Sequence, residues 1–190
     1  MARRLQESTY SGNSARRDGG AIRLSDNVTI RDSTITDNHA ESFGGGVQSF
    51  GGFGLGNTIL ANNTAASSPD GYSRFGDIAT SLGHNLIGDG TGFDITATPS
   101  DQVGTTGSTI DPMLAALADN GGPTLTHSLL PGSPAIDAGR PTFVTPTTIS
   151  LDTGTEFYPA AQLIDDSGFA QPPTFDTYAA TQHPINAGTA

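Results

Sequence analysis

The sequence lacks cysteine, tryptophan and lysine, and only 7% of its 190 residues are aromatic. The absence of cysteine excludes a disulfide framework and a cysteine-based metal site. Hydrophobic residues make up 34% of the chain, which is less than an ordinary globular core requires. No apolar run approaches the roughly 18 residues that span a bilayer. No apolar stretch follows Arg3 and Arg4, so the start does not resemble a signal peptide.

Positive charge is also scarce. Eight basic residues, all arginine, stand against 19 acidic residues, and the formal net charge is −11. An acidic chain with no basic stripe argues against binding to nucleic acids or anionic membranes. We also expect it to repel polyanionic substrates such as pectin.

What the sequence has is a repeat with a period of 25 residues. Asn13, Asn38 and Asn63 are equally spaced, and Ala15, Ala40 and Ala65 follow the same spacing. Glycine pairs recur at the same distance, and so do several apolar positions: Gly19 and Gly20 with Gly44 and Gly45, Ile22 with Val47, Ile30 with Leu55, and Ile35 with Leu60. A fixed period of this length is typical of a solenoid.

The apolar residues of each repeat alternate, as in Ile22 and Leu24 or Phe53 and Leu55, which is the spacing of β-strands with one face inward. The sequence therefore predicts an all-β fold: a single-stranded, right-handed parallel β-helix of about 25 residues per coil, with three short strands per coil and an irregular C-terminal cap and tail. We expect the Asn13/Asn38/Asn63 column to form a ladder at a turn, where asparagine tolerates positive φ and its amide bonds the next coil. The glycine pairs predict a corner at which coils approach closely or φ is positive.

Two sets of segments resemble known families. The pieces Gly19–Ile22, Gly44–Val47, Tyr10–Asn13 and Ile35–Asn38 resemble the repeats of polymorphic outer-membrane proteins. The segments Leu117–Gly139 and Ser81–Asp89 are similar to the hallmark segments of choice-of-anchor Q domain proteins. These resemblances imply a bacterial β-helix that is exported and held at the cell surface, and they imply no particular reaction.

The pattern divides the chain into three parts: regular coils over 8–72, irregular last coils and a family-specific cap over 73–139, and an extension rich in proline, threonine and alanine over 140–190. Within the second part, Pro112–Leu117 is interpreted as a helical turn and His127–Ile136 as the last strand. We expect weak order from Arg140 onward.

The sequence offers little catalytic chemistry. Asp26 and Asp32 are the carboxylates that neighbour an exposed strand in one coil, and a solvated turn is the simpler interpretation of both. Arg23 and Arg31 are interpreted as outward-facing surface residues, and His84 and His127 as packed or hydrogen-bonded structural residues. No catalytic, cofactor-binding or metal site is predicted, and calcium is expected only as an adventitious ion.

Two functions fit this pattern. The first is a non-catalytic surface or secreted module for adhesion or display, whose partners are surface glycans or proteins of a host or neighbouring cell. The alternative is a carbohydrate-active β-helix, a polysaccharide lyase or hydrolase, whose active coils lie outside this sequence. Residues 8–13 begin in the middle of a repeat, which predicts an open first coil and self-association through its unpaired strand edges.

Overall fold

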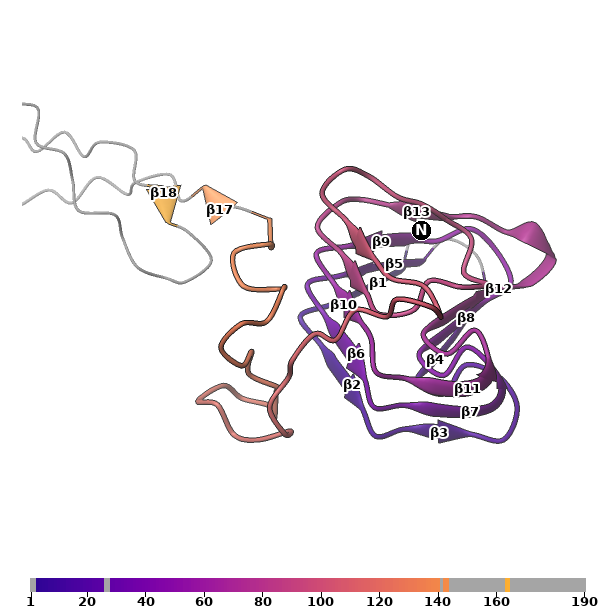
Figure 1. The fold of residues 1–190 in the computed structure, drawn as a ribbon, viewed down its shortest axis with the longest axis horizontal. Helices are drawn as coiled ribbons and strands as arrows, with labels where there is room; N and C mark the ends of the chain where they lie inside the picture. The colour runs from indigo at the N-terminus through magenta and orange to yellow at the C-terminus, as the bar shows by residue number, and fades with distance from the viewer. Residues whose placement is uncertain (1–2, 26–27, 141, 144–162, 165–190) are drawn as a thin grey trace, which may run out of the picture. The chain divides into compact units, whose positions relative to one another are not determined.

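The computed structural model describes residues 3–25, 28–140, 142–143 and 163–164. The chain divides into two units, Met1–Arg140 and Pro141–Ala190. The first unit is a parallel β-solenoid of about three regular turns, which confirms the predicted fold class (Figure 1). The described residues contain no α-helix, and none of their helical segments is long and apolar enough to cross a membrane.

Each regular coil contributes one strand to each of four parallel sheets. The two larger sheets continue through five strands. Sheet A consists of β1 (Arg3–Gln6), β5 (Val28–Arg31), β9 (Gly54–Gly56), β13 (Ala79–Ser81) and β15 (Ile95–Thr96). Sheet B consists of β2 (Thr9–Ser11), β6 (Thr34–Thr36), β10 (Ile59–Leu60), β14 (Leu86–Ile87) and β16 (Gln102–Val103).

The two smaller sheets contain three strands each, one from each regular coil. Sheet C consists of β3 (Ser14–Ala15), β7 (His39–Phe43) and β11 (Thr64–Ser67). Sheet D consists of β4 (Ile22–Leu24), β8 (Val47–Ser49) and β12 (Gly71–Ser73). The expectation of three strands per coil was therefore wrong. The strand of sheet C was not predicted, because its buried residue Ala40 is too small to give a strong alternation of hydrophobic and polar residues in the sequence.

The core is built from columns of apolar side chains between neighbouring coils. The predicted pairs stand in register: Ile22 beside Val47, Ile30 beside Leu55, and Ile35 beside Leu60. Five of these six side chains are fully buried, and Ile22 retains 8% exposure. Arg23 is exposed and Arg31 is partly exposed, as outward-facing residues should be.

Beyond the third coil the chain becomes irregular. A short 3-10 helix, η1 (Arg74–Gly76), follows sheet D, and the spacing between paired residues of sheet B lengthens from 25 to 27. Phe93 then packs on Phe53 with a ring-centroid distance of 5.9 Å. This aromatic pair fills the interior where the regular columns end.

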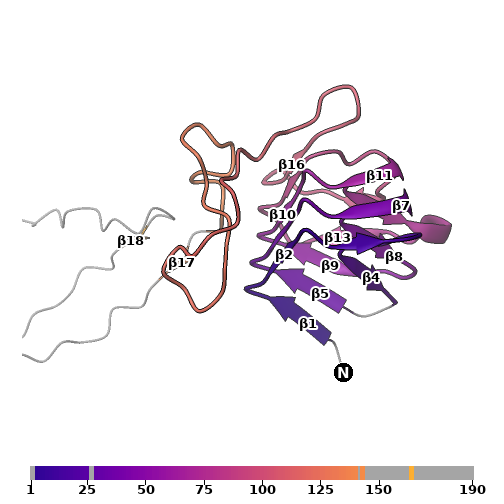
Figure 2. The same cartoon turned by 90° about the horizontal axis from the view of Figure 1, so that it is seen from below.

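Residues 111–140, called here the lateral segment, lie along the side of the stack instead of closing its end. Figure 2 shows this segment in orange beside the strands of sheets A and B. Its hydrogen bonds reach successive coils: Gln102 Nε2 donates to Pro134 O, and the Arg140 N–H donates to Asn57 Oδ1. The predicted helical turn at Pro112–Leu117 and the predicted strand at His127–Ile136 are both absent; isolated antiparallel bridges such as Leu114 to Leu129 stand in their place.

The first coil begins earlier than predicted. Strand β1 pairs in register with β5 from Arg3 beside Val28 to Gln6 beside Arg31, so Leu5 belongs to the column of Ile30 and Leu55. The start at residue 8 was wrong because a single apolar residue between two arginines and a glutamine carries little strand signal. Strands β1 to β4 form one edge of their sheets in the described part of the chain.

The second unit is described only at β17 (Thr142–Phe143) and β18 (Leu163–Ile164), which pair antiparallel. The expectation of weak order beyond Arg140 falls largely on residues that lie outside the described ones.

Candidate functional site

A ladder of asparagine side chains runs along one corner of the solenoid, between sheets B and C. The backbone N–H and Nδ2–H of Asn13 both donate to Oδ1 of Asn38 at 2.9 Å. Asn38 makes the same pair of bonds to Oδ1 of Asn63, at 3.1 and 2.9 Å. The predicted bonding between coils is thus confirmed.

The backbone geometry of this ladder differs from the prediction. Positive φ occurs at the residue before each asparagine, at Gly12 (69°), Asp37 (56°) and Asn62 (59°), and not at the asparagines themselves. The turn thereby directs Asn38 and Asn63 inward, where they are 1% and 5% exposed. The polar ladder is part of the interior.

The glycine pairs form a second corner, between sheets C and D, for both of the predicted reasons. Gly19 and Gly44 have φ values of 67° and 62°. A side chain at Gly20 would collide with the carbonyl oxygens of His39 and Gly45, so the coils approach closely there. In the third coil, Ser68 takes the position with positive φ, at 52°.

The asparagine ladder ends on a buried carboxylate. Asp70 is 2% exposed, and its Oδ1 accepts the N–H and Nδ2–H of Asn63 at 3.0 and 2.9 Å. Its Oδ2 accepts the N–H of Asp89 at 2.6 Å. Burial raises the pKa of Asp70 to about 6, because desolvation of the charged form outweighs these hydrogen bonds and the neighbouring Asp89 charge adds to the rise.

A second polar ladder lies at the corner between sheets A and B. Glu7, Asp32, Asn57 and His84 have φ values between 48° and 60°, and the residue after each turns a polar side chain toward the stack. Ser33 Oγ accepts the N–H of Ser8 at 3.3 Å, and Asn85 Oδ1 accepts the N–H of Thr58 at 3.2 Å. Because this ladder consists of serine, threonine and asparagine, no single residue type recurs in it, and the sequence repeat did not indicate it.

The second ladder also ends on an aspartate. Asp101 Oδ1 accepts the N–H and Nδ2–H of Asn85, both at 2.9 Å, and Oδ2 accepts bonds from Ser81 and Thr98. Partial burial opposes ionisation, but these hydrogen bonds hold the pKa of Asp101 below its ordinary value. In the same way, hydrogen bonds from Thr91 and Thr106 overcome burial and lower the pKa of Asp89.

The two carboxylates singled out in the sequence, Asp26 and Asp32, have different outcomes. Asp26 lies outside the described residues. Asp32 is exposed at its corner, and its Oδ1 accepts a hydrogen bond from Asn57 Nδ2 at 2.8 Å. Within the described part of the chain, no group of three potential metal-ligating side chains comes together.

Asp32 borders a hollow of about 260 Å³ between sheet B and the lateral segment. His84 lines this hollow, and its Nδ1 donates to Ala138 O at 3.0 Å. Farther along the segment, His127 Nδ1 donates to Ala115 O at 2.7 Å, and its Nε2 lies 2.9 Å from Ser11 Oγ. The predicted hydrogen bonding of both histidines is confirmed, and these bonds join the lateral segment to the solenoid.

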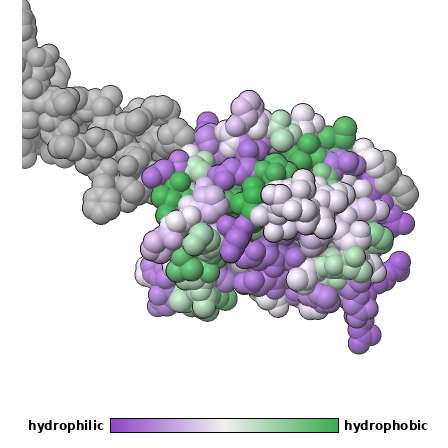
Figure 3. Space-filling model, viewed as in Figure 1, coloured by the Kyte–Doolittle hydropathy of each residue, from purple (hydrophilic) through white to green (hydrophobic). Residues whose placement is uncertain are grey.

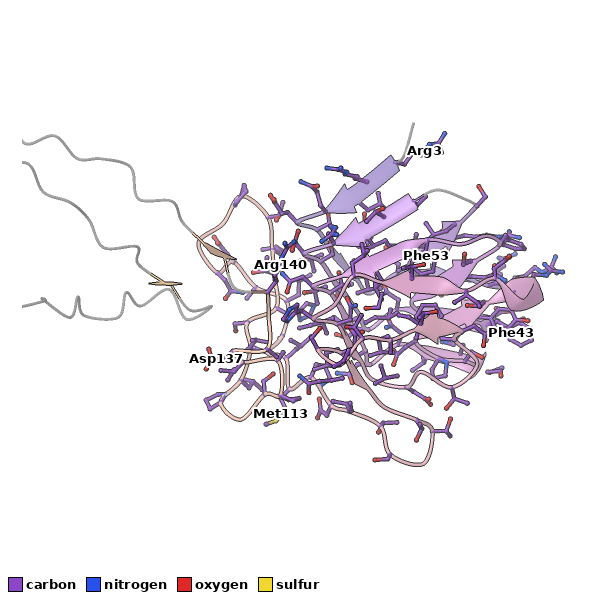
Figure 4. All side chains as sticks on the ribbon, turned by 90° about the horizontal axis from the view of Figure 1, so that it is seen from above. Arg3, Phe43, Phe53, Met113, Asp137 and Arg140 are labelled. Atoms are coloured by element: carbon purple, nitrogen blue, oxygen red, sulfur yellow. The ribbon has the colours of Figure 1, made fainter. Side chains whose placement is uncertain are left out.

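A second hollow, of about 540 Å³, lies on the other side of Asp32, against sheet A, and three arginines line it. Arg4 comes from β1, Arg31 from β5, and Arg140 from the end of the lateral segment. Figure 4 shows Arg140 where that segment meets the solenoid. This cluster could not be predicted from the sequence, because Arg140 is far from the other two arginines along the chain.

Aromatic and cationic side chains gather on the outer face of sheet D. Phe43 stacks on Tyr72 with ring centroids 4.5 Å apart. The guanidinium carbons of Arg23 and Arg74 lie 4.4 and 5.2 Å from the centroid of the Phe50 ring. The face seen in Figure 3, by contrast, is a mosaic of hydrophilic and hydrophobic residues.

Comparison with known proteins identifies no relative. No protein-family model matches the chain, no curated protein matches its sequence, and no solved structure matches its fold. The candidate sites are therefore judged on their chemistry alone.

Proposed function

We propose that this chain is a non-catalytic β-helix module that presents its outer faces for adhesion or display, outside a bacterial cell or on its surface. The resemblance of Ser81–Asp89 and Leu117–Gly139 to choice-of-anchor Q domain proteins supports the location. Surface glycans or proteins of neighbouring cells are the partners that such a module would bind.

The observation that carries this proposal is the use made of the carboxylates. Asp70 and Asp101 accept hydrogen bonds that end the two ladders, so both serve the structure. Asp32 is the only carboxylate that lines either hollow beside its corner. Glycoside hydrolysis ordinarily uses two carboxyl groups about 5 to 9.5 Å apart across the scissile bond. Neither of these two hollows supplies such a pair.

Asp70, Asp89 and Asp111 line a third hollow of about 340 Å³. There Asp70 accepts bonds from Asn63 and the Asp89 N–H, and Asp89 accepts bonds from Thr91 and Thr106, so these two carboxylates also have structural partners.

A carbohydrate-active function has one observation in its favour: Asp32 and His84 line the same hollow. A carboxylate and an imidazole together can transfer protons. Against this, His84 donates from Nδ1 to a backbone carbonyl, and Asp32 is bonded to Asn57. Both side chains thus already have a structural partner.

One assay separates the two functions. The full chain, immobilised on a surface, is exposed to a panel of neutral and acidic glycans and to bacterial cells; retention and the release of new reducing or unsaturated ends are measured together. We expect retention without release. Release that disappears in Asp32→Asn would establish the enzyme, and retention of neither glycans nor cells would contradict adhesion.

A further inference from the structure

We propose that the arginine-lined hollow on sheet A binds an acidic saccharide, through a carboxylate or sulfate group on one of its sugars. This inference rests on the proposed adhesive function and names the ligand class and the place where it binds. The shared chemistry is a compact oxyanion joined to a hydroxylated ring.

The concentration of positive charge is the first support. Three of the eight basic residues of a chain with net charge −11 line one hollow, together with a single carboxylate, that of Asp32. Asp32 accepts a hydrogen bond from Asn57 Nδ2, and among the described residues no ion pair joins Arg4, Arg31 or Arg140 to a carboxylate. Guanidinium groups without a carboxylate partner are well suited to bind an oxyanion through paired N–H donors.

The glycines of β9 leave space for the Arg31 side chain, and a backbone hydrogen bond holds Arg140 at the hollow. Gly54 and Gly56 lie on the outer face of β9, and a side chain at Gly56 would contact Leu82 Cβ at 2.9 Å and Arg31 Nη1 at 3.4 Å. The Arg31 guanidinium therefore occupies the space that this glycine leaves open. The hydrogen bond from the Arg140 N–H to Asn57 Oδ1, at 2.9 Å, holds the end of the lateral segment at the same place.

The remaining lining residues favour a sugar over a bare ion. The Thr29 hydroxyl and the Asp32 carboxylate can bond sugar hydroxyls, and Leu82, which is 40% exposed, offers an apolar wall to the C–H face of a ring. An inorganic anion would use the arginines alone. The net charge of the chain disfavours a polyanion, so a saccharide that carries one acidic group fits best.

The test is titration calorimetry on the full chain with four probes: sialyllactose, sulfated lactose, lactose and inorganic phosphate. We expect one or both acidic saccharides to bind, more weakly as salt is added, and lactose and phosphate to bind far less. Arg31→Gln should weaken that binding by about 10- to 100-fold, as loss of a charge-assisted hydrogen bond implies. Arg23→Gln is the matched control, since it removes the same charge from the outer face of sheet D and should leave the affinity nearly unchanged.

Three results would overturn the inference: no binding of either acidic saccharide, phosphate binding as tight as theirs, or equal losses in Arg31→Gln and Arg23→Gln. Failure of the adhesive function is distinguishable from these. Turnover of a glycan that depends on Arg31 would refute adhesion while retaining the site, whereas retention of cells that is indifferent to Arg31→Gln would retain adhesion and refute the site.

Discussion

The two polar ladders connect coils by the same kind of hydrogen bond, but the aspartates at their ends differ in burial. In each ladder, side chains placed after a residue with positive φ bond neighbouring coils, and each ladder ends where an asparagine donates twice to one aspartate oxygen. The first ladder is buried at the end where Asp70 lies, and burial raises the pKa of Asp70 to about 6. The second ends at a partly exposed Asp101, whose additional hydrogen bonds lower its pKa. The same hydrogen-bond pattern thus accompanies pKa shifts in opposite directions, which depend on the burial of the carboxylate and on the number of donors that bond it.

The largest expected difference between the ladders lies in their middle rungs. Asn38 Nδ2 donates to Tyr10 O, Thr36 O and Asn63 Oδ1, while Ser33 Oγ bonds only Arg31 O and the Ser8 N–H. Asn38→Ala should therefore lower the free energy of unfolding by about 3 to 4 kcal/mol, and Ser33→Ala by about 1 kcal/mol. Urea unfolding followed by circular dichroism measures both.

Asn13→Ala is the matched control for that comparison. Asn13 is the exposed first rung of the same ladder, so its loss should cost no more than about 1 kcal/mol. Equal costs for Asn38→Ala and Asn13→Ala would show that burial of the rung is irrelevant.

A smaller effect is expected at the buried end of the first ladder, and it depends on pH. Because the pKa of Asp70 rises from 3.8 to about 6 on folding, the folded chain holds this proton more tightly. The contribution of Asp70 to stability is complete below about pH 4 and is lost as pH rises through about 6, a change on the order of 3 kcal/mol. Asp70→Asn should therefore gain stability relative to the unsubstituted chain between those values.

The test measures the free energy of unfolding of the Asp70→Asn variant and of the unsubstituted chain at about pH 4 and about pH 7. The value for the unsubstituted chain is subtracted from that of the variant at each pH, and this difference should increase from about pH 4 to about pH 7. A difference between the two proteins that does not change with pH would mean that Asp70 does not titrate in this range.

The smaller of the two pH-dependent effects is expected at Asp101, with the opposite sign. Its lowered pKa means that its contribution is present above the ordinary value of 3.8 and is lost as pH falls through the folded value. Asp101→Asn should cost about 1 to 2 kcal/mol at neutral pH, because the hydrogen bonds lose their charge assistance. The cost should shrink in acid, as urea unfolding at about pH 3 would show; a cost that grows in acid would contradict the hydrogen-bond account.

The sequence predicts what repeats and misses what does not. Ile30, Leu55 and Asn38 could be placed in columns because a period of 25 residues and strand alternation point to the same register. Asp70 follows Asn63 by only 7 residues, and Asp101 follows Asn85 by 16, so neither falls on the period. The ends of the ladders depend on where the chain departs from the repeat.

The position of the lateral segment and the arginine-lined hollow could not be predicted from the sequence, for a related reason. Residues 111–140 form isolated bridges and turns but no strand or helix, and their position depends on single hydrogen bonds such as that of His84 to Ala138. The hollow requires Arg140 to return to the side of the stack, where it lies with Arg4 and Arg31. The local pattern of residues in the sequence does not indicate that the chain comes back to this position.

Hydrogen exchange at the ladder amides tests the solenoid account most directly. The backbone N–H groups of Asn38 and Asn63 bond side-chain oxygens, whereas the N–H of Ala61 bonds the backbone oxygen of Ile35. If the ladders are part of the interior, the amides of Asn38 and Asn63 should exchange as slowly as that of Ala61 in the intact chain. Exchange at the rate of the exposed Gly107 would contradict the account.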